Sequence, residues 1–280
     1  MTNETLSLVK SARPFSLVVA VVSCGLGVYL GLRETVAPLL IVVGVLVAGL
    51  LLQIGVNLIN DRSDLHLLRG DAPATKTRRA RIRLSYRLGL ICFGIAVGIG
   101  LALVMLRGWP LLTIGIAGVI GAFAYTLEPI NYKRRGLGVM MVFWLMGVMM
   151  VEGAYLAVTG TLSWQVFWHA LPVSCLVSLL LLSNEIRDIE RDRGEGVATL
   201  AVRIGLARAR GLFWALALAA FALSIVYSLI GLLSNPLWLI LPVPLLIPVM
   251  RHLYTDARQS LPPWTGRLLL LFGIGYALAL

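Results

Sequence analysis

The sequence predicts an all-α fold: a polytopic membrane bundle of nine transmembrane helices with its polar loops on the cytoplasmic side. Of its 280 residues, 59% are hydrophobic and 13% are charged, and the mean hydropathy is +0.91. One water-soluble core cannot bury that much apolar surface. The apolar residues also fall into runs near the ~20 residues that a bilayer core requires. These two observations exclude a soluble globular protein.

Nine apolar runs predict the helices in chain order. They cover 14–32, 36–60, 86–106, 110–127, 137–158, 165–186, 210–232, 236–254 and 265–280. The first run follows Lys10 and Arg13 and is not followed by a small-residue cleavage site, so we expect a retained helix rather than a signal peptide. No Gly/Ser-rich or Pro-rich linker separates the runs, so we expect residues 1–280 to form one domain.

The charge distribution predicts the topology. The chain has a formal net charge of +11. If the amino terminus is cytoplasmic, 22 of the 24 Lys and Arg residues fall on the cytoplasmic side, and only Arg33 and Arg107 fall on the other. Such an asymmetry is the usual orientation signal of membrane proteins. The basic excess is therefore a topology signal, and no nucleic acid is expected as a partner.

Two of the predicted helices end in similar polar sequences. The second ends in NLINDRSD, residues 57–64, and the sixth ends in NEIRDIERD, residues 184–192. Each end carries an asparagine and two aspartates at spacings that place them on one face of a helix. The two trios are Asn57, Asp61 and Asp64, and Asn184, Asp188 and Asp192.

A row of carboxylates at the rim of a bilayer is costly unless a cation compensates it. Mg²⁺ suits this role because it prefers oxygen ligands and completes its shell with water and phosphate, and an asparagine carbonyl is a neutral oxygen ligand. The alternative is a solvated end, or pairing with Arg62, Arg187 and Arg191, which stabilises little at a surface. Because the pattern occurs at two ends, we expect the two ends to meet in one Mg²⁺ site.

The two blocks resemble the paired acidic motifs of the UbiA superfamily of intramembrane prenyltransferases. NLINDRSD matches the pattern Asn-x-x-x-Asp-x-x-Asp, and DIERD, residues 188–192, matches Asp-x-x-x-Asp. Other stretches are similar to the 1,4-dihydroxy-2-naphthoate polyprenyltransferase branch of the superfamily. They are SNEIRDIERDRGEGVATLAVRIG at 183–205, ARP at 12–14, AYTLEP at 124–129, GLG at 136–138 and EGAYLAVTG at 152–160.

The resemblance implies Mg²⁺-dependent transfer of a polyprenyl group from a polyprenyl diphosphate to an aromatic acceptor, with 1,4-dihydroxy-2-naphthoate of menaquinone biosynthesis as the expected acceptor. It also implies an integral protein of the prokaryotic inner (plasma) membrane, surrounded by the lipid bilayer, with the amino terminus and the active-site loops cytoplasmic.

The same resemblance assigns candidate roles to residues. The catalytic residues are Asp61, Asp64, Asp188 and Asp192, and the Mg²⁺ ligands are these four with Asn57 and Asn184. The candidates for binding diphosphate are Arg13, Lys76, Lys133 and Arg134, and the alternative for each is a charge that only sets the membrane orientation. Lys76 and Lys133 are expected in loops beside the acidic ends. The prenyl or acceptor pocket is assigned Tyr125 and Asp71, and Asp64 or Asp71 is the candidate base. Candidates for shielding a carbocation, with helix packing as the alternative, are Tyr125, Phe143, Trp144, Met140, Met141 and Met146.

Two departures from the family pattern leave the acceptor open. The naphthoate branch usually has an acid directly after Gly-Leu-Gly, where this chain has Val139. Many members also have an acid where this chain has Leu68, and Asp71 is a possible substitute. A UbiA-type enzyme with another acceptor and a UbiA-type terpene cyclase are therefore alternatives. A secondary transporter is a third, but transporters usually place ionisable groups near the midplane of the membrane.

Overall fold

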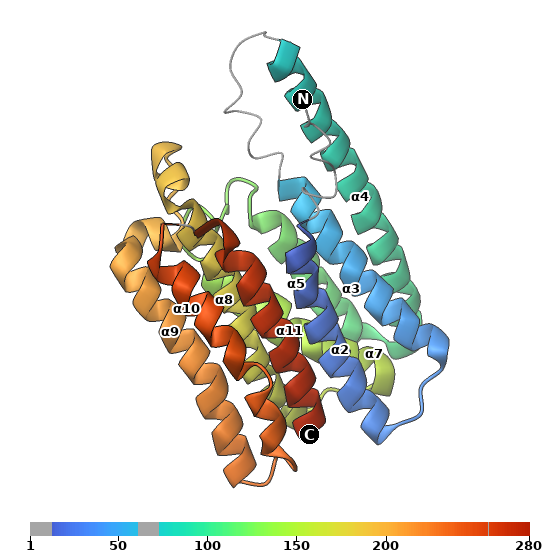
Figure 1. The fold of residues 1–280 in the computed structure, drawn as a ribbon. Coiled ribbons are helices and arrows are strands. Elements are labelled where there is room, and N and C mark those ends of the chain that lie inside the picture. Colours follow the sequence, from blue (N-terminus) through green and yellow to red (C-terminus); the bar gives the residue numbers. More distant parts are fainter. Residues whose placement is uncertain (1–12, 61–72, 257) are drawn as a thin grey trace.

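The computed structural model of the chain describes residues 13–60, 73–256 and 258–280. The regular structure of these residues is helical throughout, with no strand among them. The helices lie side by side in one bundle (Figure 1), which confirms the predicted all-α membrane bundle. Seven helices of this part of the chain are long and apolar enough to cross a bilayer, and Trp109–Ala124 is a shorter apolar helix. The predicted count of nine is therefore approximate.

The elements follow the predicted apolar runs in order, and the runs 14–32, 137–158 and 236–254 each contain more than one element. In chain order they are η1 (Pro14–Ser16), α2 (Leu17–Glu34), α3 (Leu39–Asn60), α4 (Pro73–Arg107), α5 (Trp109–Ala124), α6 (Gly138–Val142), the π-helical η3 (Phe143–Val148), α7 (Met149–Thr159), α8 (Trp164–Gly194), α9 (Leu200–Leu229), η4 (Pro236–Ile240), η5 (Val243–Leu245), α10 (Leu246–Tyr254), η6 (Arg258–Ser260) and α11 (Leu261–Ala279).

Three predicted boundaries differ from the structure by eight residues or more, each at a polar end of a helix. Helix α4 begins at Pro73 rather than at 86, α8 continues to Gly194 rather than to 186, and α9 begins at Leu200 rather than at 210. Hydropathy marks the stretch that matches the bilayer core, whereas backbone hydrogen bonding continues into the polar sequence beyond it. Proline is favourable at the first position of a helix, as at the start of α4.

Helix α8 is the central element of the bundle. In its most apolar 18-residue stretch 78% of the residues are buried, compared with 28% for α3 and 22% for the apolar part of α4. It packs along α9 and α11 and against η3. The central position explains why this one helix, whose last turns carry Asn184, Asp188 and Asp192, can present polar groups to several neighbours at once.

Glycines allow the helices around the site to approach closely, as small residues commonly do between membrane helices. A Cβ atom at Gly27 of α2 would lie 2.2 Å from the carbonyl oxygen of Val151 in α7. A Cβ atom at Gly147 of η3 would lie 2.2 Å from Oγ of Ser174 in α8. The backbones of these pairs are therefore in direct contact.

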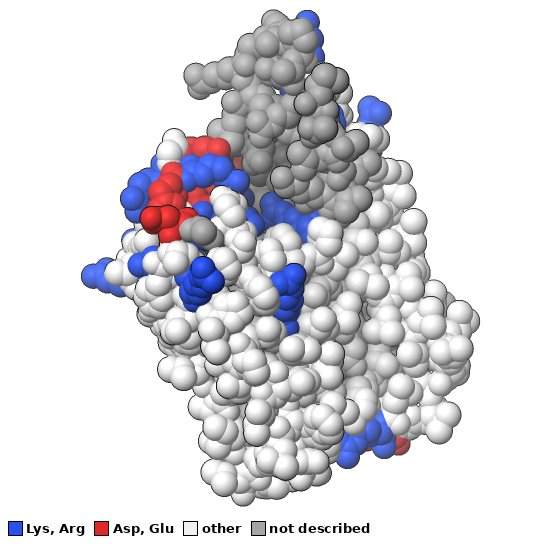
Figure 2. Space-filling model, in the orientation of Figure 1, with Lys and Arg blue, Asp and Glu red and all other residues white. Residues whose placement is uncertain are grey.

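The charged side chains gather at the two ends of the bundle, with a broad uncharged band between them (Figure 2). Helices α2, α4 and α7 end together at the end remote from the acidic turn of α8 (Figure 1). There Arg107 donates from Nε to the Ala157 carbonyl at 2.8 Å and from Nη2 to the Val158 carbonyl at 2.7 Å, and the Tyr155 hydroxyl donates to Glu34. Arg33 and Arg107 thus lie at the ends of helices on this remote side, as the charge pattern predicts.

Candidate active site

A cavity of about 110 Å³ lies where the polar ends of α2, α3, α5 and α8 converge. Its polar lining comes from Arg13, Ser16, Gln53, Asn57, Asn60, Tyr125, Tyr132 and Asn184, and its apolar lining includes Val19, Leu52, Gly118, Leu145, Met146 and Met150. Asn57 and Asn184 come from the two similar helix ends and face the same cavity. The structure therefore brings the two ends together, together with Arg13 and Tyr125.

Asn57 is held in place from both sides. Its Nδ2 donates to Oγ of Ser16 at 2.8 Å, and Oγ of Ser16 donates to the carbonyl oxygen of Arg13 at 2.9 Å. Gln53, one turn earlier on α3, approaches Oδ1 of Asn57 with its Nε2 at 3.4 Å. Arg13 has φ of 50°, in the left-handed region that residues other than glycine rarely adopt. This chain of contacts fixes the start of α2 against the end of α3.

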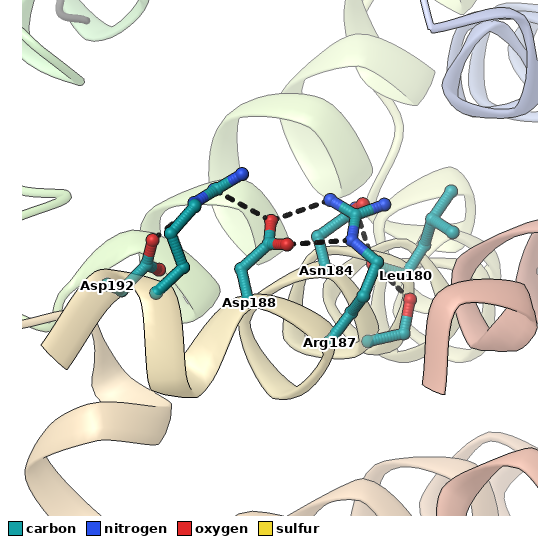
Figure 3. Close-up of polar contacts among 7 residues, drawn as sticks. Leu180, Asn184, Arg187, Asp188 and Asp192 are labelled. Atoms are coloured by element: carbon teal, nitrogen blue, oxygen red, sulfur yellow. Dashed lines mark hydrogen bonds and ion pairs between the residues drawn. The ribbon is translucent and has the colours of Figure 1, made fainter. Parts of the chain in front are cut away.

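Asn184 leaves one oxygen available at the cavity. Its Nδ2 donates to the carbonyl oxygen of Leu180 at 2.9 Å (Figure 3), and its Oδ1 is buried with no hydrogen-bond partner among the described residues. If the Asn184 amide were turned over, its Oδ1 would face the Leu180 carbonyl oxygen, and two acceptors would lie against each other. The hydrogen bond therefore assigns Nδ2 to this position and Oδ1 to the other. A buried carbonyl without a partner is costly, and a cation would satisfy it.

Asp188 and Asp192 follow Asn184 by one and two turns on α8 (Figure 3). Arg187 binds Asp188 through Nε at 2.9 Å and Nη2 at 2.6 Å, and Nη2 of Arg191 lies 3.0 Å from the same carboxylate. Arg191 also lies 3.4 Å from Oδ1 of Asp192. The pairing with Arg187 and Arg191 that the sequence offered as an alternative is thus present, and it neutralises much of the charge of Asp188.

The residues present fit Mg²⁺ in chemistry. Asn184 and the two aspartates of α8 carry oxygen ligands, although the aspartates do not line the cavity and both oxygens of Asp188 bind Arg187. The free Oδ1 of Asn184 is the group that a hard cation would complete. Among the described residues no cluster of three or more His, Cys, Asp or Glu side chains is close enough to hold a metal ion. The other predicted carboxylates, Asp61, Asp64 and the candidate base Asp71, lie outside the described residues.

The loop between α5 and α6 brings Lys133 to the acidic end of α8. The backbone N–H of Lys133 donates to the Tyr125 carbonyl at 3.1 Å, and the Tyr132 hydroxyl donates to the Gly121 carbonyl at 2.8 Å. The Lys133 ammonium interacts electrostatically with the carboxylates of Asp192 and Glu185. Lys133 therefore lies beside the acids in a loop, as predicted.

The other predicted cations differ in their positions. Arg134 lies in the same loop, where its carbonyl accepts a hydrogen bond from Nη2 of Arg203 at 3.0 Å. The expectation of a loop for Lys76 is wrong, because Lys76 is an exposed residue of the first turn of α4. That end of α4 extends beyond the neighbouring helices (Figure 1).

Tyr125 is a neutral phenol at neutral pH. Burial raises its pKa well above the ordinary value, the Glu185 carboxyl adds to the shift, and the Arg13 guanidinium opposes it. The ring packs edge-on against Tyr132 with centroids 5.2 Å apart. Tyr125 can thus present an electron-rich ring or donate a hydrogen bond, but it cannot serve as an anionic base.

Sequence reasoning missed Glu185, a buried acid between the two motif positions Asn184 and Asp188. Its Oε2 accepts a hydrogen bond from the backbone N–H of Ala201 at 3.0 Å, near the start of α9, and its Oε1 has no hydrogen-bond partner within the described part of the chain. A Cβ atom at Gly138 would lie 3.3 Å from that Oε1. The position of Glu185 inside the motif sequence NEIRD could have marked it as a site residue. Its contact with α9 cannot be predicted from the spacing of residues in the sequence.

The residues proposed to shield a carbocation differ in position. Met141 and Phe143 are half-buried and do not line the cavity, whereas Tyr125 does. Met146 lines the cavity. Met140 and Trp144 are 52% and 44% exposed, on the outer surface of the bundle.

Val139, which replaces the usual acid, is buried, and its carbonyl accepts a hydrogen bond from Oγ of Ser178 at 3.0 Å. Val139 therefore packs in the interior of the bundle.

Known proteins resemble this chain in sequence and in fold. The chain matches the UbiA prenyltransferase family over residues 12–273. It is 31% identical over 265 residues to a 1,4-dihydroxy-2-naphthoate octaprenyltransferase of Mycobacterium tuberculosis, covering 87% of this chain and 90% of the relative. It is 32% identical over 204 residues to the protein of the same name from Mycobacterium leprae, covering 69% of each. A solved UbiA homologue from Archaeoglobus fulgidus, bound to GPP and Mg²⁺, superposes with a TM-score of 0.66 at 13% identity, covering 96% of this chain and 99% of that one. The chain therefore belongs to the UbiA prenyltransferase family of membrane enzymes.

Proposed function

We propose that this prenyltransferase moves a polyprenyl group from an isoprenoid diphosphate to 1,4-dihydroxy-2-naphthoate in a Mg²⁺-dependent reaction. The observation that carries the proposal is the convergence of Asn57 and Asn184 on one cavity, although they are 127 residues apart in the sequence. The naphthoate acceptor is supported by the names of the two mycobacterial relatives. The isoprenoid donor is supported by the GPP-bound homologue.

The diphosphate end of the donor is assigned to the polar end of the cavity. Arg13 lines the cavity and Lys133 lies beside the acidic turn of α8, so both can neutralise phosphate oxygens, and Arg134 and Lys76 are the further candidates. When bound, Mg²⁺ would supply additional positive charge to the leaving diphosphate. Asn57, Asn184, Asp188 and Asp192 of the described residues would hold it, with Asp61 and Asp64.

The reaction breaks the bond between the allylic carbon and the diphosphate oxygen, and the diphosphate leaves with the electron pair. A ring carbon of the acceptor then bonds to the allylic carbon, and the ring regains aromaticity when the proton of that carbon passes to a base, for which Asp64 and Asp71 are the candidates. Tyr125 and Met146 line the cavity and can stabilise positive charge on the allylic carbon with an electron-rich ring and a polarisable sulfur. The apolar lining excludes water from the carbocation.

We place the active site on the cytoplasmic side of a prokaryotic inner membrane, with the amino terminus on the same side. The charge asymmetry supports this orientation, because 22 of the 24 basic residues would then be cytoplasmic.

Product identification tests the proposed acceptor. Membranes that contain the protein are supplied with octaprenyl diphosphate and Mg²⁺, with and without 1,4-dihydroxy-2-naphthoate, and the products are identified by mass spectrometry. We expect a prenylated naphthoate product only when the acceptor is present. A cyclised hydrocarbon formed without acceptor would instead identify a terpene cyclase. Movement of the prenyl diphosphate across the membrane without release of diphosphate would identify a transporter.

A further inference from the structure

Gln53 is a buried polar residue of the cavity to which the proposed reaction gives no role. It lies on α3, one turn before Asn57, and is 4% exposed. Gln53 lines the cavity, and its Oε1 is buried with no hydrogen-bond partner among the described residues. Within the described part of the chain, Asn184 is the one other cavity-lining residue with such an oxygen. A buried amide oxygen without a donor is costly, and a ligand that donates a hydrogen bond would satisfy it.

Neighbouring hydrogen bonds fix the orientation of the Gln53 amide. Ser16 donates its Oγ proton to the Arg13 carbonyl, so its Oγ can only accept from Asn57, which therefore offers Nδ2. The Oδ1 of Asn57 then faces Gln53 at 3.4 Å and requires the Nε2 of Gln53 as its donor. If the Gln53 amide were turned over, two oxygens would lie against each other. The atom left without a partner is therefore Oε1, which can only accept.

Gln53 lies at the boundary between the polar and the apolar lining of the cavity. Helix α3 ends at Asn60, at the acidic end of the bundle, so Gln53 is about 6 Å deeper than Asn57 at ~1.5 Å per residue. The preceding residue, Leu52, belongs to the apolar lining. In the proposed function Asn57 and Asn184 hold Mg²⁺ beside the diphosphate. The allylic carbon bonded to that diphosphate then lies on the deeper side of them, at the level of Gln53.

The components of the proposed reaction differ in what they can offer to Oε1 of Gln53. Diphosphate oxygens are negatively charged and repel an amide oxygen, and the isoprenoid chain has no polar hydrogen. Mg²⁺ binds amide oxygens, but the ligand proposed for it on this helix, Asn57, lies one turn nearer the end of α3. A hydroxyl on an aromatic ring donates a hydrogen bond, and the acceptor must bring its ring to the allylic carbon.

We propose that Oε1 of Gln53 accepts a hydrogen bond from a ring hydroxyl of the aromatic acceptor, which makes Gln53 a specificity-determining residue. The inference rests on the proposed function, because it takes the diphosphate to lie at the polar end of the cavity. A site that binds a substrate hydroxyl in this way discriminates against an analogue that lacks the hydroxyl, because the polar group of the site then stays unpaired. The same contact holds the acceptor ring beside the allylic carbon.

Two substitutions separate this contact from a general effect of buried polarity. Gln53→Met removes the amide with little change in side-chain size. Ser23→Ala is the matched control, because Oγ of Ser23 on α2 is also buried with no partner among the described residues, whereas Ser23 does not line the cavity. Each substitution removes an oxygen that has no partner, so both ligand-free variants should keep the wild-type melting temperature.

The first experiment measures the affinity of three naphthoates for the detergent-solubilised protein. They are 1,4-dihydroxy-2-naphthoate, 1-hydroxy-2-naphthoate and 4-hydroxy-2-naphthoate, and each is added with Mg²⁺ and an unreactive thiolodiphosphate analogue of the donor. We expect the wild type and Ser23→Ala to bind the diol about tenfold more tightly than one of the two monohydroxy compounds. Gln53→Met should lose this preference. A wild type without the preference, or a Gln53→Met protein that keeps it, would overturn the inference.

A parallel turnover assay separates this inference from the proposed function. Wild-type protein is given octaprenyl diphosphate, Mg²⁺ and 1,4-dihydroxy-2-naphthoate, and the prenylated product is measured. If the preference depends on Gln53 but no product forms, the hydroxyl contact holds and the proposed function fails. Product formation with the same preference in Gln53→Met refutes the hydroxyl contact alone. A wild type that binds none of the three naphthoates refutes both. A raised Mg²⁺ requirement in Gln53→Met, with the preference intact, would place Gln53 at the metal and overturn the inference.

Discussion

The contact between α2 and α7 allows a quantitative prediction. In Gly27→Ala the new methyl carbon would lie 2.2 Å from the Val151 carbonyl oxygen and 3.0 Å from the Tyr155 backbone nitrogen. Carbon and carbonyl oxygen normally approach to about 3.3–3.6 Å, so the two helices must separate by roughly 1 Å. The obstructing atoms include rigid backbone. We therefore expect an overpacking cost of about 1–3 kcal/mol.

Gly25→Ala is the matched control on the same helix, because its Cβ atom meets nothing within 4 Å. Both substitutions gain a similar helix propensity, roughly 0.5–1 kcal/mol, so their difference isolates the overpacking term. The assay is the apparent melting temperature of the detergent-solubilised protein, where Gly27→Ala should melt on the order of a few degrees below Gly25→Ala. Displacement of α2 also moves Ser16 away from Asn57, so activity should fall. Equal melting temperatures for the two variants would refute the close contact.

Two further predictions concern the loop between α5 and α6. Lys133→Ala should raise the apparent KM for the prenyl diphosphate about tenfold, the loss expected for one charge-assisted contact of about 1.5 kcal/mol. Arg135 is an exposed cation of the same loop, and Arg135→Ala should leave the KM unchanged. A wild-type KM in Lys133→Ala would show that Lys133 does not bind the diphosphate. Tyr132→Phe deletes the hydrogen bond to the Gly121 carbonyl and should cost about 0.5–1.5 kcal/mol of stability, seen as a lower melting temperature. A Tyr132→Phe protein as stable as the wild type would show that this bond does not hold the loop.

The sequence was informative where one strong physical constraint acts. The bilayer requires long apolar helices, so hydropathy predicted the bundle and its order of helices. The cost of acids at the membrane rim made the matching ends of α3 and α8 conspicuous, and the structure brings Asn57 and Asn184 to one cavity.

The remaining features depend on packing that hydropathy does not describe. The helical turns before residue 86 and after residue 186 are polar, so the bilayer constraint says nothing about them, and Lys76 was placed in a loop for that reason. Glu185 accepts a hydrogen bond from Ala201 because the start of α9 folds back onto α8.

The central claim is that the ends of α3 and α8 form one Mg²⁺ site for diphosphate. The most direct measurement is Mg²⁺-dependent diphosphate release from a prenyl diphosphate by Asp61→Asn and Asp188→Asn. Glu190→Ala is the control, an acid on the last turns of α8 whose side chain is 63% exposed and paired with Arg258. We predict that both aspartate variants remain folded and lose release, while Glu190→Ala retains it. Release at the wild-type rate in either aspartate variant would contradict the shared site.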